Sequence, residues 1–130
     1  MPISIGLRGE ATVAVTDANT AAALGSGSLR VFGTPAMLAL MEQAACNALA
    51  AHLEPGQTSV GTHLDVSHEA ATPVGLTVRA EAVVTAVDGR KIAFRVSAYD
   101  VRGPIGSGTH ERCLVREDAF VERTYAKLQP

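Results

Sequence analysis

The chain has 130 residues, the size of one domain, and we expect residues 1–130 to fold as a single unit. Its 11 Lys and Arg and 13 Asp and Glu give a formal net charge of −2 and form no basic run, which argues against a nucleic-acid surface. With two Tyr, three Phe and no Trp, it also lacks aromatic side chains for stacking on single-stranded bases.

The N-terminal residues show no targeting signal. Residues 1–6 contain no basic region followed by an apolar core, and no apolar run reaches the roughly 18 residues that a membrane span requires. We therefore expect a cytoplasmic protein without a membrane partner. Residues 6–16 alternate loosely between apolar and polar side chains, which predicts a first strand.

The segment 17–33 has weak secondary-structure signals. Residues 17–20 can cap a short Ala-rich turn of helix, and residues 25–28 are Gly-Ser-Gly-Ser, typical of a flexible loop. Such a long irregular stretch is uncommon in a small domain and often has a function. Two interpretations stay open: a lid over a binding site, or a mobile connection.

Residues 34–53 predict one long helix. Thr34 suits the N-cap and Pro35 the first helical position, while Pro55 and Gly56 end the segment. Apolar residues lie around most of the circumference, so we expect the helix to be buried on most sides.

Four strand candidates follow the helix, and a short amphipathic helix is predicted at 118–128. A turn at Asp88-Gly89 joins two strands that alternate well, which predicts a hairpin. The four strand candidates are residues 59–71, 75–87, 91–101 and 105–116.

This order predicts an α+β architecture, in which a curved antiparallel sheet of about five strands wraps one long central helix. That arrangement is the hot-dog fold. A single sheet covers only part of such a helix, and hot-dog proteins usually complete its burial by pairing two sheets. From the fold assignment we therefore expect a homodimer.

Glu42 is the only charged residue of the predicted helix. An ionised carboxylate in an apolar helix is costly unless it is paired or hydrogen-bonded. It is either kept for specificity or chemistry, or it emerges at the surface beside Gln43 and is merely solvated.

Thr34 has a structural interpretation as an N-cap and a compatible chemical one. Backbone N–H groups at a helix start stabilise a developing oxyanion, and a hydroxyl there can bind a substrate or accept an acyl group. Thr34 and Glu42 lie eight residues apart, roughly 12 Å along a helix axis. That is too far for a direct hydrogen bond, so a site using both requires either that the chain bends back at Thr34 or that a partner subunit supplies one of them. We predict a site at a dimer interface.

His68 lies on a predicted strand, where a lone His is more often structural than catalytic. His63 and His68 lie five apart and face opposite sides of a strand, and no His pair has helical zinc-site spacing, so we expect no metal. Cys46 and Cys113 are expected to be buried free thiols.

Several runs carry a family resemblance that extends from about Val31 to Arg116. In them the chain resembles the fluoroacetyl-CoA thioesterase-like family of hot-dog acyl-CoA thioesterases. The matching runs are Leu40–Glu42 with Ala44–Cys46, Leu53–Gly56, Ser59, Gly61–Thr62, Val66, His68, Ala70–Pro73, Gly75–Val78, Arg95–Ala98 with Asp100, and Ile105–Arg112.

The resemblance implies that Thr34, Glu42 and His68 are catalytic. It also implies that the Gly61 backbone N–H contacts the acyl group and that Arg112 lies in the substrate pocket. We expect no cofactor, since CoA is part of the substrate, and an active site at the interface of a homodimer.

One departure concerns the family's aromatic lid, which is missing from residues 24–29. Phe32 is the only aromatic residue nearby and is a further substrate-binding candidate. We therefore expect hydrolysis of an acyl-CoA to free acid and CoA without selectivity for fluoroacetyl-CoA.

In this mechanism Glu42 acts as general base or nucleophile, and His68 positions or protonates. The alternatives are a non-catalytic acyl-CoA-binding protein, a hot-dog hydratase or dehydratase, which would use a helix Asp that this chain lacks, and a purely structural dimerisation domain.

Overall fold

The computed structural model describes residues 2–130. Five strands, three α-helices and three short 3₁₀ turns follow one another along this part of the chain. In chain order they are β1 (Arg8–Ala14), η1 (Asp17–Asn19), α1 (Ala21–Leu24), α2 (Thr34–Leu49), η2 (Ala50–His52), β2 (Gln57–His68), β3 (Thr77–Asp88), β4 (Lys91–Asp100), β5 (Gly103–Arg116), α3 (Glu117–Tyr125) and η3 (Ala126–Leu128).

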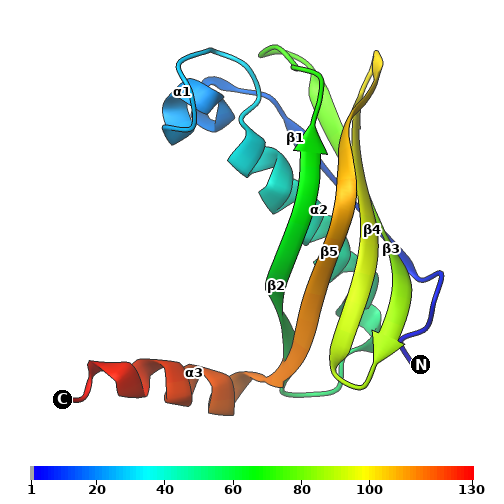
Figure 1. Ribbon diagram of the computed structural model, residues 1–130, viewed down its shortest axis with the longest axis vertical. Helices are drawn as coiled ribbons and strands as arrows, with labels where there is room; N and C mark the ends of the chain where they lie inside the picture. The colour runs from blue at the N-terminus through cyan, green and yellow to red at the C-terminus, as the bar shows by residue number, and fades with distance from the viewer. Residues whose placement is uncertain (1) are drawn as a thin grey trace.

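The strands form one antiparallel sheet in the order β1-β3-β4-β5-β2, so β1 and β2 are its edges. The sheet curves along α2, which packs against β1, β3, β4 and β2 (Figure 1). The predicted α+β arrangement of one long helix and a five-stranded antiparallel sheet is confirmed. The predicted β3–β4 hairpin is confirmed too, with its turn at Gly89.

The core lies between α2 and the concave face of the sheet. Alternate residues of β3 and β4 point at the helix, as the period of two in the sequence predicts. Their partners on α2 are Met37, Leu40, Met41, Ala44, Ala45, Ala48 and Leu49. Within this chain one side of the helix is exposed, where Ala39, Gln43 and Asn47 form a stripe along it.

The start of α2 differs from the prediction. Gly33, not Thr34, is the N-cap, and its carbonyl accepts the first helical hydrogen bond from Met37 N at 3.0 Å. Thr34 is therefore the first helical residue, with Pro35 second, and its hydroxyl makes no capping bond. The extended backbone of Gly33 moves the cap by one residue and leaves the Thr34 hydroxyl available for another partner.

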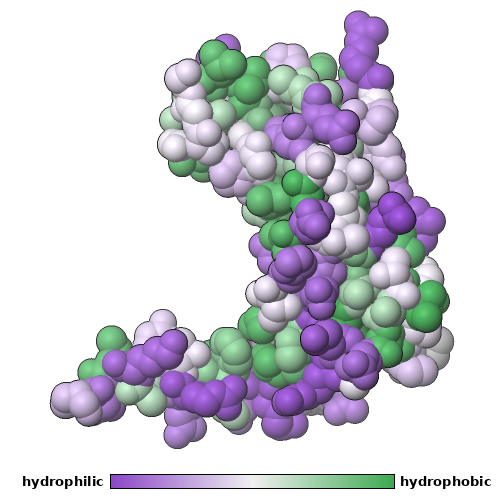
Figure 2. All heavy atoms as spheres, in the orientation of Figure 1, coloured by the Kyte–Doolittle hydropathy of each residue, from purple (hydrophilic) through white to green (hydrophobic). Residues whose placement is uncertain are grey.

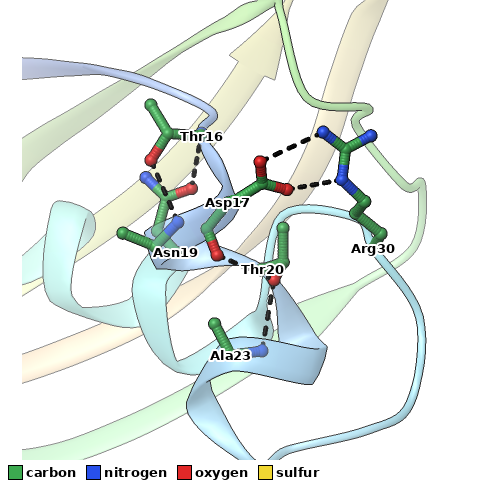
Figure 3. A network of polar contacts seen from close by, with 7 residues as sticks. Thr16, Asp17, Asn19, Thr20, Ala23 and Arg30 are labelled. Carbon is green, nitrogen blue, oxygen red and sulfur yellow. Dashed lines mark hydrogen bonds and ion pairs between the residues drawn. The ribbon is translucent and has the colours of Figure 1, made fainter.

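The segment 17–33 folds back on itself. Thr16 caps η1 and Thr20 caps α1, and Arg30 pairs with Asp17 across the loop (Figure 3). Ala21 N also bonds to Val31 O at 2.8 Å. The Ala-rich turn predicted for this segment is confirmed, and these bonds close it into a loop beside the start of α2 (Figure 1).

The C-terminal helix predicted at 118–128 is present as α3 and η3. It leaves the end of β5 and projects away from the sheet (Figure 1). Neither α3 nor η3 contains a buried residue. Within residues 2–130, no helix is long and apolar enough to cross a membrane.

Cys46 and Cys113 are free thiols, as predicted, but both are partly exposed rather than buried. Cys113 lies between two buried residues of β5, so strand alternation turns its side chain to the opposite face. Cys46 lies at the margin of the buried face of α2.

We predict that Gly9→Ala destabilises the fold, because β1 crosses α2 with no room for a side chain at this position. A Cβ on Gly9 would lie 2.2 Å from Ala44 O and 2.3 Å from Ala48 N. Forcing the strand away from the helix should lower the free energy of unfolding by about 2–3 kcal/mol, measured by urea titration. Gly27→Ala is the matched control, since its Cβ would meet Ala21 at an ordinary 3.4 Å; equal losses in both variants would contradict the prediction.

Candidate active site

Thr34 and His68 meet at the start of α2. Thr34 Oγ1 lies 2.7 Å from Nδ1 of His68, the last residue of β2. The other ring nitrogen, Nε2, is buried and has no hydrogen-bond partner among the described residues. A hydroxyl bonded to an imidazole is the geometry of a nucleophile or substrate-binding group beside a base, and the second nitrogen stays available for a ligand.

A pocket of about 230 Å³ opens beside this pair. The closed loop 17–33 forms one wall, and residues following β2 form another. Apart from Thr34 and His68 it is lined by Ala21, Ser26, Val31, Phe32, Glu69, Ala70 and Ala71. Phe32 is the only aromatic lining residue and is buried at 1% exposure, so it forms the pocket's inner wall.

The loop after β2 is held by a hydrogen bond from a buried hydroxyl. Thr72 is fully buried, and its hydroxyl donates to Asp100 Oδ2 at 2.7 Å, while its carbonyl accepts from Phe32 N at 2.8 Å. The bond from Thr72 lowers the pKa of the Asp100 carboxyl. This contact fixes Phe32 and the pocket wall to the end of β4.

Glu42 and Arg112 form a second cluster further along α2. Arg112 Nη1 donates to Glu42 Oε2 at 3.1 Å, with the arginine side chain 7% exposed and the glutamate 38%. Nε donates to Ser59 Oγ at 2.8 Å, and Nη2 donates to Ser59 O at 3.2 Å. Glu42 is therefore the carboxylate that balances a buried guanidinium, and not merely a solvated neighbour of Gln43.

The cluster of Glu42 and Arg112 also includes His110. It is fully buried, its Nε2 lies 3.1 Å from Arg112 Nη1, and its Nδ1 lies 2.8 Å from His63 O. The Phe94 ring stacks on it with centroids 5.9 Å apart. Burial is the main cause that lowers the pKa of His110, and the positive charge of Arg112 acts in the same direction.

Gly61 lies across from Arg112 in the β2–β5 ladder, next to a bulge between Gly61 and His63. A Cβ at Gly61 would lie 2.2 Å from Glu42 Oε2. The missing side chain therefore makes room for the carboxylate, which rests against the strand backbone.

The residues predicted for the site form two groups within the chain. Thr34 and His68 lie together, with Phe32 in the wall of their pocket, whereas Glu42, Gly61 and Arg112 lie together elsewhere. The two groups share no direct contact, because α2 runs unbroken from Thr34 to Glu42 over roughly 12 Å.

Ser59 and His110 were not predicted as members of the site. His110 and Arg112 stand two residues apart on β5, so strand alternation places both on one face. That signal indicates a buried polar pair, but the strand register is needed to identify Ser59 as the partner. Among residues 2–130, no group of three or more His, Cys, Asp or Glu is arranged to hold a metal ion.

A long helix on the concave face of a five-stranded antiparallel sheet defines the hot-dog class, and solved structures confirm it. A hot-dog-like protein from Thermanaerovibrio acidaminovorans has a TM-score of 0.86 and 25% identity over 97% of this chain and 93% of its own. A Thermus thermophilus thioesterase superfamily member has a TM-score of 0.88 and 28% identity over 98% and 94%.

The chain belongs to the fluoroacetyl-CoA-specific thioesterase family, whose model matches residues 15–118. A fluoroacetyl-CoA thioesterase from Streptantibioticus cattleyicolor is 50% identical over 90 residues, 69% of this chain and 65% of the relative. The match thus spans just under two thirds of that relative's length. The structure of the fluoroacetyl-CoA thioesterase FlK has a TM-score of 0.91 and 38% identity, covering 98% of each chain.

We predict that the buried, neutral His110 makes the fold sensitive to mild acid. Its folded pKa lies below the ordinary value of 6.5, so the unfolded chain binds the proton more readily. This contribution to stability is complete above about pH 6.5 and is lost as the pH falls toward the folded pKa. Between pH 7.5 and 5.5, urea titrations should show a smaller loss in the free energy of unfolding for His110→Gln than for the wild type. The same loss in both proteins would contradict the prediction. His63→Gln, which removes an exposed imidazole, is the matched control.

Proposed function

We propose that this protein hydrolyses an acyl-CoA thioester to the free acid and CoA. The observation that carries the proposal is the Thr34–His68 contact at a small pocket, with the second imidazole nitrogen buried and unpartnered among residues 2–130. Membership of a thioesterase family supports it, as does the 50% identity to a curated fluoroacetyl-CoA thioesterase.

In the proposed reaction, the acyl group occupies the pocket and its carbonyl faces the start of α2. Free backbone N–H groups there and the Thr34 hydroxyl would stabilise the developing oxyanion. In the homodimer proposed below, the Gly61 backbone N–H that joins them would come from the second copy, together with its Glu42. Glu42 either takes a proton from the attacking water or attacks the carbonyl carbon itself, forming an anhydride that water then opens. The C–S bond breaks in both routes, and His68 supplies a proton to the CoA thiolate.

We further propose that the working enzyme is a homodimer with its active site at the subunit interface. Within one chain, Glu42 has its own partners and does not line the Thr34–His68 pocket. Two exposed features support the binding of a second copy of the chain: the stripe of Ala39, Gln43 and Asn47 on α2, and the edge strand β2. The molecule is also hollowed beside them, between the loop 17–33 and α3 (Figure 2). A partner seated there would bring its own Glu42 toward this chain's Thr34 and His68.

The lining of the pocket supports the hydrolysis of acyl-CoAs besides fluoroacetyl-CoA. Ala21, Ser26 and Ala71 present small side chains, and residues 24–29 contribute no aromatic ring. Phe32 is held in the wall, where its ring can contact the acyl chain without closing over it. We therefore propose turnover of ordinary short acyl-CoAs.

The alternative functions have less support. A non-catalytic acyl-CoA binder has no need of a hydroxyl–imidazole pair, and a hydratase of this fold would use an acidic Asp that α2 lacks. The absence of a cofactor other than substrate CoA and the cytoplasmic location stay predictions from the sequence.

We predict that Glu42→Gln lowers kcat for acyl-CoA hydrolysis by at least about 100-fold, because an amide neither accepts a proton nor attacks the carbonyl. The assay follows free thiol release from a panel of acyl-CoAs. Glu122→Gln on the exposed α3 makes the same chemical change away from the site and is the control. Near wild-type turnover in Glu42→Gln would remove Glu42 from the mechanism, and no turnover by the wild type would favour the non-catalytic alternative.

We predict that Ser26→Phe narrows the acyl pocket. A ring at this lining position should lower kcat/KM for acyl groups of four or more carbons by about tenfold relative to acetyl-CoA. Ser28→Phe adds the same ring to the same loop, but Ser28 does not line the pocket, so it serves as the control. Equal effects of Ser26→Phe on short and long acyl groups would contradict this account of selectivity.

A further inference from the structure

His110 is a buried polar residue for which the proposed mechanism has no role. It lies at 0% exposure on β5, two residues before Arg112, with its ring between Phe94 and the guanidinium. A side chain so deeply buried does not reach a substrate in the pocket. Any effect on the reaction must pass through the side chains it touches.

The hydrogen bonds of His110 determine its protonation state. Arg112 can only donate, so Nε2 of His110 must accept from Nη1 with a lone pair. His63 O can only accept, so Nδ1 must carry the proton and donate to it. Both partners therefore require the same neutral tautomer, and the ring is held at both nitrogens and by the Phe94 stack.

The nitrogen that His110 holds is the one that binds Glu42. Arg112 Nη1 carries two N–H groups and contacts both Glu42 Oε2 and His110 Nε2, each at 3.1 Å. Ser59 holds the other two nitrogens of the guanidinium. Without an acceptor at the His110 position, a buried N–H would lose its partner and the guanidinium would turn to find another.

We propose that His110 is a positioning residue, which acts through Arg112 to hold the Glu42 carboxylate in the orientation that thioester hydrolysis requires. The proposal rests on the hydrolysis proposed above. The required feature is a neutral hydrogen-bond acceptor at the Nε2 position, not the ring itself. A displacement of about 1 Å at a reacting group lowers a rate by up to about a hundredfold, so the acceptor controls kcat.

Two substitutions separate positioning from packing. In His110→Gln the side-chain oxygen can replace Nε2 as the acceptor for Arg112. In His110→Asn the shorter amide can still donate to His63 O but cannot reach Arg112. Both remove the ring that stacks on Phe94, so both should lower the melting temperature.

The test compares kcat, KM and melting temperature for the two variants and the wild type, using the acyl-CoA that the wild type hydrolyses fastest. We expect His110→Asn to lose kcat about tenfold or more with KM within about twofold, and His110→Gln to keep most of its kcat. Equal losses in the two variants, or losses that follow the melting temperature, would overturn the role of His110. No turnover by the wild type would instead remove the proposed function and this role with it.

A second measurement does not depend on the variants folding. The ¹⁵N chemical shifts of the His110 ring in the wild-type protein distinguish a protonated Nδ1 from a protonated Nε2. A proton on Nδ1 and none on Nε2 at pH 7.5 is the expected result. A proton on Nε2 would be incompatible with acceptance from Arg112 and would overturn the proposal.

Discussion

The buried guanidinium of Arg112 is the interaction on which the candidate site depends. A cation in the space between α2 and the sheet is tolerated only if its charge is balanced and its N–H groups are satisfied. Its partners come from three separate elements: Glu42 on α2, Ser59 on β2 and His110 on β5. The pairing therefore ties the helix to the edge of the sheet in a fixed position.

This single charge explains several neighbouring residues. Glu42 supplies the balancing carboxylate, and Gly61 has no side chain because that carboxylate occupies the space. His110 must be neutral, since a second proton on its ring would point at the guanidinium. The start of α2 does not depend on this charge. Gly33 caps the helix there, which leaves the Thr34 hydroxyl to bond with His68.

Much of the fold was predictable, because local patterns decide it. The alternation of buried and exposed residues predicts β3 and β4 and the face of each that packs on the helix. The long run of apolar residues predicts α2. The unusual status of Glu42 was predictable too, as a lone charge in an apolar helix. The helix start singled out Thr34, whereas the family resemblance, rather than any local rule, singled out His68, Gly61 and Arg112.

The remaining features depend on contacts between distant segments. Gly33 rather than Thr34 is the N-cap because the chain enters α2 from the closed loop 17–33. That loop is hydrogen-bonded to Thr72, a contact that no local sequence pattern predicts. Ser59 joined the site through the β2–β5 register, which the bulge between Gly61 and His63 interrupts.

The central claim is that one active site needs Thr34 and His68 from one chain and Glu42 from another. It is tested most directly by mixing two inactive proteins, Glu42→Gln and His68→Ala, after unfolding and refolding them together. Each mixed dimer would hold one intact site and one doubly altered site, so the mixture should regain about a quarter of wild-type activity, following the random pairing of equal amounts. Refolded mixtures that form mixed dimers but show no activity above the two separate variants would contradict the claim.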